Sequence, residues 1–160
     1  MKNYVLVLFI AVFGLSSCLK KDNTDPYADA KVQLAKDTTI IRKFITDNNI
    51  PAIKDASGIF YQIIEPGSGN VTYSTNTQIE AIYTGKLLNG TIFDTSVGKA
   101  NLKIALGKVI TGWQIGIPLI QKGGKIRLII PSGYAYGNQI VGGIPANSIL
   151  DFDIELVNVQ

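Results

Sequence analysis

The amino-acid sequence predicts an α+β fold in which a twisted antiparallel sheet of five to six strands wraps a short helix, with a further helix before it. Three observations predict this class. Short segments rich in β-branched and aromatic residues recur between glycine and proline turns. The dipeptide Asn89-Gly90 separates two of these segments, as in a β-hairpin. Residues 28–48 instead carry apolar residues near helical spacing.

Residues 1–17 have the pattern of a leader. One basic residue, Lys2, precedes an uncharged apolar run over residues 4–15. A membrane-spanning helix needs about 20 such residues, so the shorter run fits the hydrophobic region of a signal peptide. The sequence LSSC at residues 15–18 resembles the bacterial lipoprotein signal, which implies cleavage before Cys18 and lipidation of Cys18. The alternative is an ordinary secretory signal that leaves Cys18 as a free thiol.

Residues 18–27 are expected to form a tether between the lipid and the folded part. The segment is polar, contains Pro26 and lacks apolar periodicity. Leader and tether together predict an extracytoplasmic, lipid-anchored bacterial membrane protein, with the outer membrane as the expected location.

An N-terminal helical segment is expected over residues 28–56. Ile41, Phe44 and Ile45 lie near helical spacing, and the helix is expected to end before Pro51. The simpler interpretation is a helix that packs on its own domain. The alternative is a helix that forms a homodimer or binds a partner.

The remaining elements follow from alternation and turn residues. Residues 77–96 predict a hairpin with a type I′ turn at Asn89-Gly90. Residues 109–120 predict a strand end that enters a short helix, kept brief by its glycines and proline. Further strands are expected at residues 57–69, 101–107, 125–131 and 148–159. The last two are joined by a long loop that contains GYAYGNQIVGGIP, and an ordered loop of that length is usually functional.

Composition excludes several classes of function. The 160 residues include no histidine, which rules out Ser-His and Cys-His nucleophilic pairs and histidine-ligated metals. Cys18 is the single cysteine, so intrachain disulfides are excluded as well. The formal net charge is +3 and no block of like charge stands out, so nucleic acid is not an expected partner. We expect no metal and no cofactor.

Three stretches of sequence carry a family resemblance. They are YTGKLLNGTIFDTS, LGKVITGWQIGIPLIQKGGKIRLIIPSGYAYG and GGIPANSILDFDIELVNV. In order and spacing they resemble the FKBP-type peptidyl-prolyl cis-trans isomerases, and the similarity covers residues 57–160, which are expected to form the isomerase domain. The resemblance implies an enzyme that acts on proline-containing polypeptides during protein folding. The alternative is a catalytically weak module on the same fold that binds proline peptides or acts as a chaperone.

The resemblance also implies a pocket of aromatic and aliphatic side chains that holds a proline. The catalytic positions it implies are Tyr83, Phe93, Asp94, Trp113, Tyr136 and Phe152, and the substrate-binding positions are Leu102, Val109, Ile110 and Ile144. Taken singly, Phe93, Val109, Trp113 and Phe152 are more typical of an ordinary core, and it is their joint fit to the order of the motifs that favours a pocket. Leu102 stands where the family commonly has phenylalanine. The segment after Asp94 lacks the arginine that often pairs with this aspartate in the family, which leaves Lys99 as a substitute.

Overall fold

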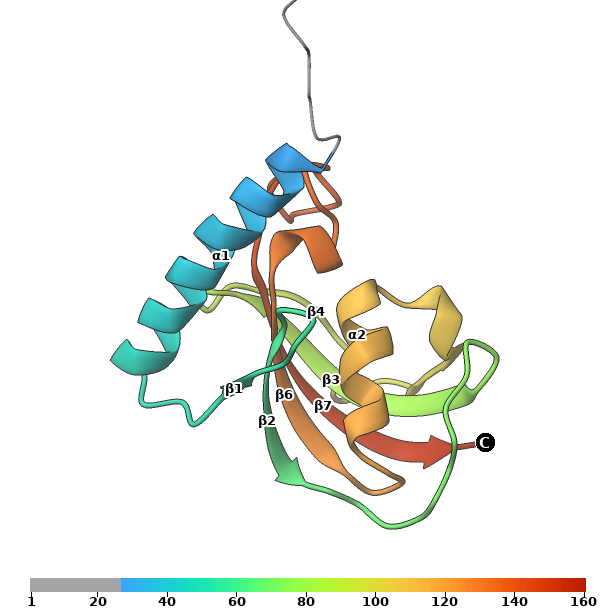
Figure 1. Ribbon diagram of the computed structural model, residues 1–160. Coiled ribbons are helices and arrows are strands. Elements are labelled where there is room, and N and C mark those ends of the chain that lie inside the picture. The colour runs from blue at the N-terminus through green and yellow to red at the C-terminus, as the bar shows by residue number, and fades with distance from the viewer. Residues whose placement is uncertain (1–26) are drawn as a thin grey trace, which may run out of the picture.

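An N-terminal helix, seven strands and a short internal helix make up residues 27–160, the part of the chain that the computed structural model describes (Figure 1). The helices are α1 (Ala28–Asp47) and α2 (Thr111–Gly116), with short 3-10 turns η1 (Leu106–Lys108), η2 (Ile117–Leu119) and η3 (Ser132–Tyr134). The strands are β1 (Ile53–Lys54), β2 (Phe60–Glu65), β3 (Gln78–Leu87), β4 (Ile92–Thr95), β5 (Leu102–Ala105), β6 (Lys125–Ile130) and β7 (Leu150–Val159).

The strands form one antiparallel sheet in the order β1-β2-β6-β7-β3-β4, with β5 pairing β3 beyond the end of β4. The predicted α+β class is confirmed. The sheet reaches seven strands because the two-residue β1 extends its edge. The long strands β3 and β7 lie side by side from Ile79 opposite Val159 to Leu87 opposite Leu150, and this pair forms the centre of the curved sheet.

The concave face of the sheet curves around α2 (Figure 1). Ile117, Leu128 and Ile154 are buried in the core between them. Two glycines allow the close approach, because a Cβ added at Gly112 would lie 2.5 Å from Cγ2 of Ile130, and one at Gly116 would lie 2.5 Å from Cδ1 of Leu128. The glycines expected to shorten this helix therefore also set its contact distance to β6.

Helix α1 crosses the opposite face of the sheet (Figure 1). Ile41 is fully buried there and forms a second apolar cluster with Phe60, Ile129 and Ile149. Phe44 and Ile45 pack against the same cluster. The structure therefore confirms the simpler interpretation, in which the helix packs on its own domain.

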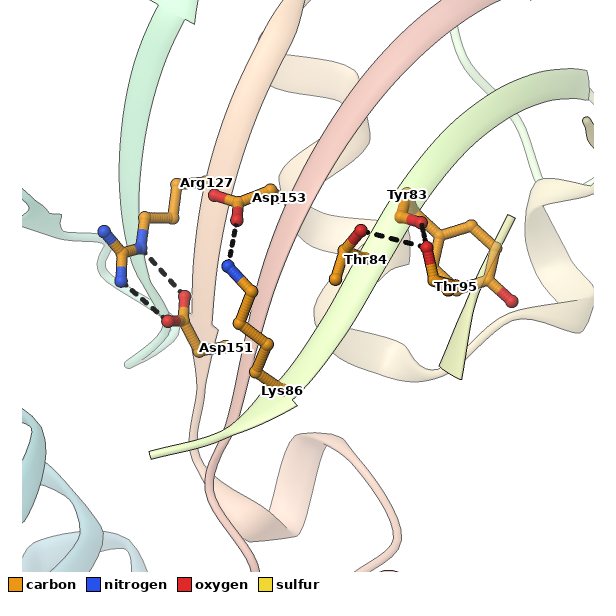
Figure 2. Close-up of polar contacts among 7 residues, drawn as sticks. All are labelled: Tyr83, Thr84, Lys86, Thr95, Arg127, Asp151 and Asp153. Carbon is orange, nitrogen blue, oxygen red and sulfur yellow. Dashed lines mark hydrogen bonds and ion pairs between the residues drawn. The ribbon is translucent and has the colours of Figure 1, made fainter. Parts of the chain in front are cut away.

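Charged side chains occupy the sheet where α1 does not cover it (Figure 2). Arg127 of β6 donates two hydrogen bonds to Asp151 of β7, from Nε at 2.9 Å and from Nη2 at 2.7 Å. Lys86 of β3 pairs with Asp153 of β7 at 2.6 Å. Asp151 is only 3% exposed, and its hydrogen bond raises the pKa of the Arg127 guanidinium above its ordinary value. This bidentate pair fastens β6 to β7.

The hairpin between β3 and β4 does not have the predicted type I′ turn. That turn needs positive φ at both Asn89 and Gly90, and only Gly90 has it, at 88°. The Gly90 N–H donates to the Leu87 carbonyl, and the Leu87 N–H donates to the Thr91 carbonyl. The Asn89 side chain instead accepts from the Thr91 N–H at 3.0 Å. The loop is thus one residue longer than expected, with a left-handed glycine as its last member.

One edge of β3 is shared by β5 and β4, and Tyr83 lies at the junction between them. The Tyr83 N–H donates to Oγ of Ser96 at 3.0 Å, and the Tyr83 carbonyl accepts from the Ser96 N–H at 3.0 Å. Thr95 adds a hydroxyl bond to the same carbonyl and lies 3.0 Å from the Thr84 hydroxyl (Figure 2). Thr95, the last residue of β4, and Ser96, which follows it, therefore complete the hydrogen bonding of Tyr83 at the junction between β4 and β5.

The expected signal peptide at residues 1–17, the lipidated Cys18 and nearly all of the tether lie outside the described residues. Within residues 27–160, no helix has the length and apolar character needed to cross a membrane.

Candidate functional site

Four aromatic rings from four elements meet on the concave side of the sheet. Trp113 of α2 lies edge-to-face with Tyr83 of β3 at a centroid distance of 5.3 Å, and with Phe152 of β7 at 5.4 Å. Phe93 of β4 meets Phe152 at 5.5 Å, again nearly perpendicular. Perpendicular contacts at these distances are favourable, because the positive edge of one ring faces the negative face of the next. The cluster therefore holds its rings in fixed orientations.

Gly85 provides the space for two of these rings. It lies on β3 directly opposite Phe152 of β7 and Asp94 of β4. A Cβ added there would lie 2.6 Å from Cζ of Phe93 and 2.7 Å from Cε1 of Phe152. No side chain fits at this position without displacing both rings. Gly85 was not among the residues expected at the site, although it lies within the YTGKLL stretch.

The rings line a hollow of about 270 Å³. Clefts that hold drug-sized ligands measure roughly 300–1,000 Å³, so this hollow is suited to one apolar side chain and the groups next to it. Its lining consists of Tyr83, Phe93, Asp94, Leu102, Lys108, Val109, Ile110, Trp113, Tyr136 and Phe152. Trp113 is 3% exposed, and its indole Nε1 has no hydrogen-bond partner within the described residues. The floor of the hollow is therefore the buried ring of Trp113.

One carboxylate lies in this apolar lining. Asp94 accepts a hydrogen bond from the Tyr83 hydroxyl. Burial of the Tyr83 ring, followed by this hydrogen bond and the charge of Asp94, raises the pKa of Tyr83 above its ordinary value of 10.0. The hydroxyl therefore stays protonated at neutral pH and continues to donate. Lys99 does not replace the missing arginine, because its Nζ donates to the Thr95 carbonyl at 3.0 Å.

A larger hollow, of about 530 Å³, lies between α1 and the turn that starts at Ser132. Its large apolar lining residues are Leu34 and Tyr134, and the rest of the lining is small or polar. The Tyr134 hydroxyl is already bonded to the Ser57 carbonyl at 2.6 Å. This hollow lacks the fixed aromatic rings and the bonded carboxylate, so the smaller hollow is the candidate site.

Comparison with known proteins agrees with this geometry. Residues 69–157 match the profile of a family described as FKBP-type peptidyl-prolyl cis-trans isomerase. The chain belongs to this FKBP family. The matched segment runs from before β3 to near the end of β7 and contains every residue that lines the aromatic hollow.

Individual FKBP relatives show how far the similarity extends. The FKBP-type isomerase FkpA of Buchnera aphidicola is 45% identical over 108 residues, which are 67% of this chain and 43% of that protein. The crystal structure of FkpA from Escherichia coli matches with a TM-score of 0.70 and 38% identity, over 82% of this chain and 61% of that one. A peptidyl-prolyl cis-trans isomerase of Pseudomonas syringae matches with a TM-score of 0.66 and 32% identity, over 82% of this chain and 96% of that one. The chain spans less than half the length of the curated FkpA proteins, at 43% and 48% for those of Buchnera and Escherichia coli.

Nearly all the residues expected from the FKBP resemblance lie around the one hollow, and Ile144 is the exception. Ile144 is 5% exposed and packs in the main core, where its N–H and carbonyl bond to Val141. Lys108 lies in the lining and was not expected there. It follows Gly107 in η1 with no distinguishing sequence pattern, so only the folded chain places it at the hollow.

Proposed function

We propose that the chain is a peptidyl-prolyl cis-trans isomerase that accelerates rotation about X-Pro bonds in extracytoplasmic protein folding. The observation that supports it most directly is the aromatic hollow between Tyr83, Phe93, Trp113 and Phe152, with one bonded carboxylate in its wall. Membership of the FKBP family supports the same activity.

An apolar hollow suits this reaction because of the nature of its barrier. Rotation about the X-Pro bond breaks amide resonance, with a barrier of about 18–20 kcal/mol, and takes tens to hundreds of seconds uncatalysed. The planar amide is more dipolar than the twisted one. A site without water therefore disfavours the planar ground state more than the twisted transition state, which lowers the barrier. No proton transfer and no nucleophile are required, which agrees with a chain that lacks histidine.

Each residue of the lining has a role in this proposal. The Trp113 indole is the floor on which the proline ring rests, and Tyr83, Phe93 and Phe152 are the walls. Leu102, Val109 and Ile110 contact the residue before proline at the mouth of the hollow. The Tyr136 hydroxyl orients the carbonyl before proline. Asp94 holds the Tyr83 hydroxyl and places a negative charge at the wall of the hollow. Ile144 supports the loop from behind, in agreement with its burial.

The isomerase activity is tested with a short peptide whose proline follows leucine, using a protease that cleaves only the trans form. We expect the purified protein to shorten the slow phase in proportion to its concentration. We expect Trp113→Leu to remove most of this acceleration, whereas Lys103→Ala, an exposed change on β5, leaves it intact. A slow phase equal to the spontaneous one would contradict the proposal.

A second candidate function is a module that binds proline peptides with little turnover. Leu102 favours it, because an aliphatic residue is less rigid than the aromatic that the family commonly has at this position. The two functions differ in one measurement. A binding module quenches or shifts Trp113 fluorescence on addition of the peptide without shortening the slow phase.

The expected domain organisation also remains a proposal: signal peptide 1–17, tether 18–27, helical segment 28–56 and isomerase domain 57–160. Its support is the leader pattern before Cys18 and the start of α1 at Ala28. In bacteria grown with a labelled fatty acid, we expect label on the wild-type protein in the outer-membrane fraction and none on Cys18→Ser. Label on neither protein would contradict lipid anchoring.

The homodimer alternative rests on two exposed side chains of α1, Val32 at 53% and Ile40 at 50%. Ile41, Phe44 and Ile45 of the helix instead pack against its own sheet. Light scattering of the wild-type protein and of Ile40→Glu decides the matter. A dimer mass that falls to the monomer value in the variant supports the dimer, and a monomer mass in both removes it.

A further inference from the structure

A buried carboxylate on α1 has no part in the aromatic hollow. Asp37 lies in the middle of the helix and is 1% exposed. Among residues 27–160 no ion pair involves it. Burying a carboxyl group is costly unless its oxygens are hydrogen-bonded. The hydrogen-bond partners of Asp37 therefore indicate its role.

The partners of Asp37 lie at the start of the loop that carries Tyr136. Its Oδ2 accepts from the Ser132 N–H at 2.8 Å and from the Ser132 hydroxyl at 2.6 Å. Its Oδ1 accepts from Nε2 of Gln33, one turn earlier on α1, at 2.8 Å. Ser132 is fully buried and begins η3, directly after Pro131. One carboxylate oxygen therefore holds both donors of a single residue.

Ser132 in turn holds the backbone on both sides of Tyr136. Its carbonyl accepts from the Ala135 N–H at 3.0 Å and from the Gly137 N–H at 2.9 Å. The Gly137 carbonyl accepts from the Asn147 N–H at 2.7 Å, which closes the base of the loop. An unbroken series of hydrogen bonds thus runs from α1, through Ser132, to the residues that flank Tyr136.

Side chains of α1 and of the same turn also approach one residue, Gly58. Leu34 of α1 and the Tyr134 ring both lie over Gly58, where an added Cβ would be 3.5 Å from Cδ1 of Leu34 and 3.7 Å from Cε2 of Tyr134. Tyr134 points away from the aromatic hollow and bonds Ser57, while Tyr136 lines the hollow. Tyr134 is therefore fixed by Ser57, in the connection between α1 and β2, whereas Tyr136 faces the aromatic hollow.

We propose that Asp37 is a positioning residue for isomerisation: from α1, outside the matched domain, it fixes the 132–137 turn and so places the Tyr136 hydroxyl at the hollow. This rests on the proposed function, in which that hydroxyl orients the carbonyl before proline. It assigns to α1 a role in the reaction itself, beyond covering the sheet.

The test is a double-mutant cycle between the two ends of this series. Asp37→Leu keeps the branched shape of the side chain and removes both acceptors, and Tyr136→Phe removes only the hydroxyl. We expect each to lower kcat/KM about fivefold, since one hydrogen bond contributes on the order of 1 kcal/mol, and the double variant to lose no more than either single one. A double variant that loses about 25-fold, the product of two independent effects, would overturn the proposal.

Two further variants separate positioning from stability. Asp37→Asn retains one oxygen that can accept both bonds from Ser132, and the half-buried Gln33 amide can turn to accept from the new NH₂. We expect it to restore the wild-type rate. Asp47→Leu changes an exposed acid on the same helix and is the matched control, expected to have no effect. A rate for Asp37→Asn as low as for Asp37→Leu would count against the hydrogen-bond series.

Hydrogen exchange gives a readout that does not depend on activity. The Gly137 amide, bonded to Ser132, is expected to exchange about tenfold faster in Asp37→Leu than in wild type, while the amides of β6 do not change. Should Asp37→Leu not fold, Ser132→Ala, which removes only the hydroxyl, takes its place in the cycle with Tyr136→Phe. An inactive wild-type protein would end the proposed function, whereas an active wild type with unchanged Gly137 exchange in the variant would end only this inference.

Discussion

Gly85 of β3 faces Phe152 of β7 across the centre of the sheet, and the absence of its side chain allows Phe152 and Phe93 to meet edge-to-face at 5.5 Å. A Cβ at this position would lie within 3 Å of both rings. The shape of the hollow therefore depends on a residue that contributes no atom to its lining.

We expect Gly85→Ala to lower both stability and activity. Forcing one extra carbon into a packed core costs about 1–3 kcal/mol, and here the strain falls on two walls of the site. Urea unfolding and the coupled proline assay measure the two effects. Gly143→Ala is the matched control, because a Cβ there meets nothing within 4 Å. Equal stability of the two variants would show that the rings move aside freely.

We expect Asp94→Ala to lower kcat/KM about fivefold, because the wall loses its only carboxylate and the Tyr83 hydroxyl loses its acceptor. Lys99→Ala is expected to leave the rate unchanged, since Lys99 bonds the Thr95 carbonyl and not Asp94. The coupled assay at substrate concentrations well below KM measures both. If Lys99→Ala lowered kcat/KM as much as Asp94→Ala, Lys99 would act as the substitute for the arginine after all.

The raised pKa of Tyr83 predicts a loss of stability in alkali. Below pH 10 the hydroxyl is protonated in the folded and unfolded states alike, so its contribution is fully present. As the pH rises past 10 the unfolded chain loses this proton first, and the free energy of unfolding falls. Urea unfolding at pH 9 and pH 11 is expected to show a larger fall for wild type than for Tyr83→Phe. Identical falls would mean that Tyr83 titrates alike in both states.

We expect Arg127→Met to destabilise the fold by about 3–5 kcal/mol, because it leaves Asp151 buried without its partner. The double change Arg127→Met with Asp151→Leu is expected to recover most of this loss, since no uncompensated charge remains. Lys43→Met breaks an exposed pair with Asp47 on α1 and should cost less than about 1 kcal/mol. Thermal and urea unfolding measure the three variants.

The sheet and both helices could be predicted from the sequence because their signals are local. Alternation in the last strand and the helical spacing of Ile41, Phe44 and Ile45 each reflect one face turned to an apolar layer. The hairpin was placed correctly but with the wrong turn, because Asn89-Gly90 fits both a two-residue loop and the end of a three-residue loop. The register of the two strands selects the three-residue loop, and the dipeptide does not encode that register.

The order of the motifs predicted the site residues that belong to those motifs. The motifs brought Tyr83, Trp113 and Phe152 to one hollow, but Lys108 has no pattern around it and Gly85 acts by what it lacks. Asp37 shows most clearly what the sequence could not predict. An acid within an amphipathic helix is typical of a solvated face, and only its tertiary contact with Ser132, 95 positions away, shows that it is buried.

The junction at Tyr83 has a consequence for the edge of β3 beside the hollow. A strand edge beside a substrate site would offer free N–H and carbonyl groups to any extended polypeptide, which is how sheets recruit unwanted partners and aggregate. Ser96 and Thr95 already bond the N–H and carbonyl groups of Tyr83. In the proposed isomerase, an extended polypeptide at the hollow would therefore meet side chains and find no free backbone group of Tyr83 with which to extend the sheet.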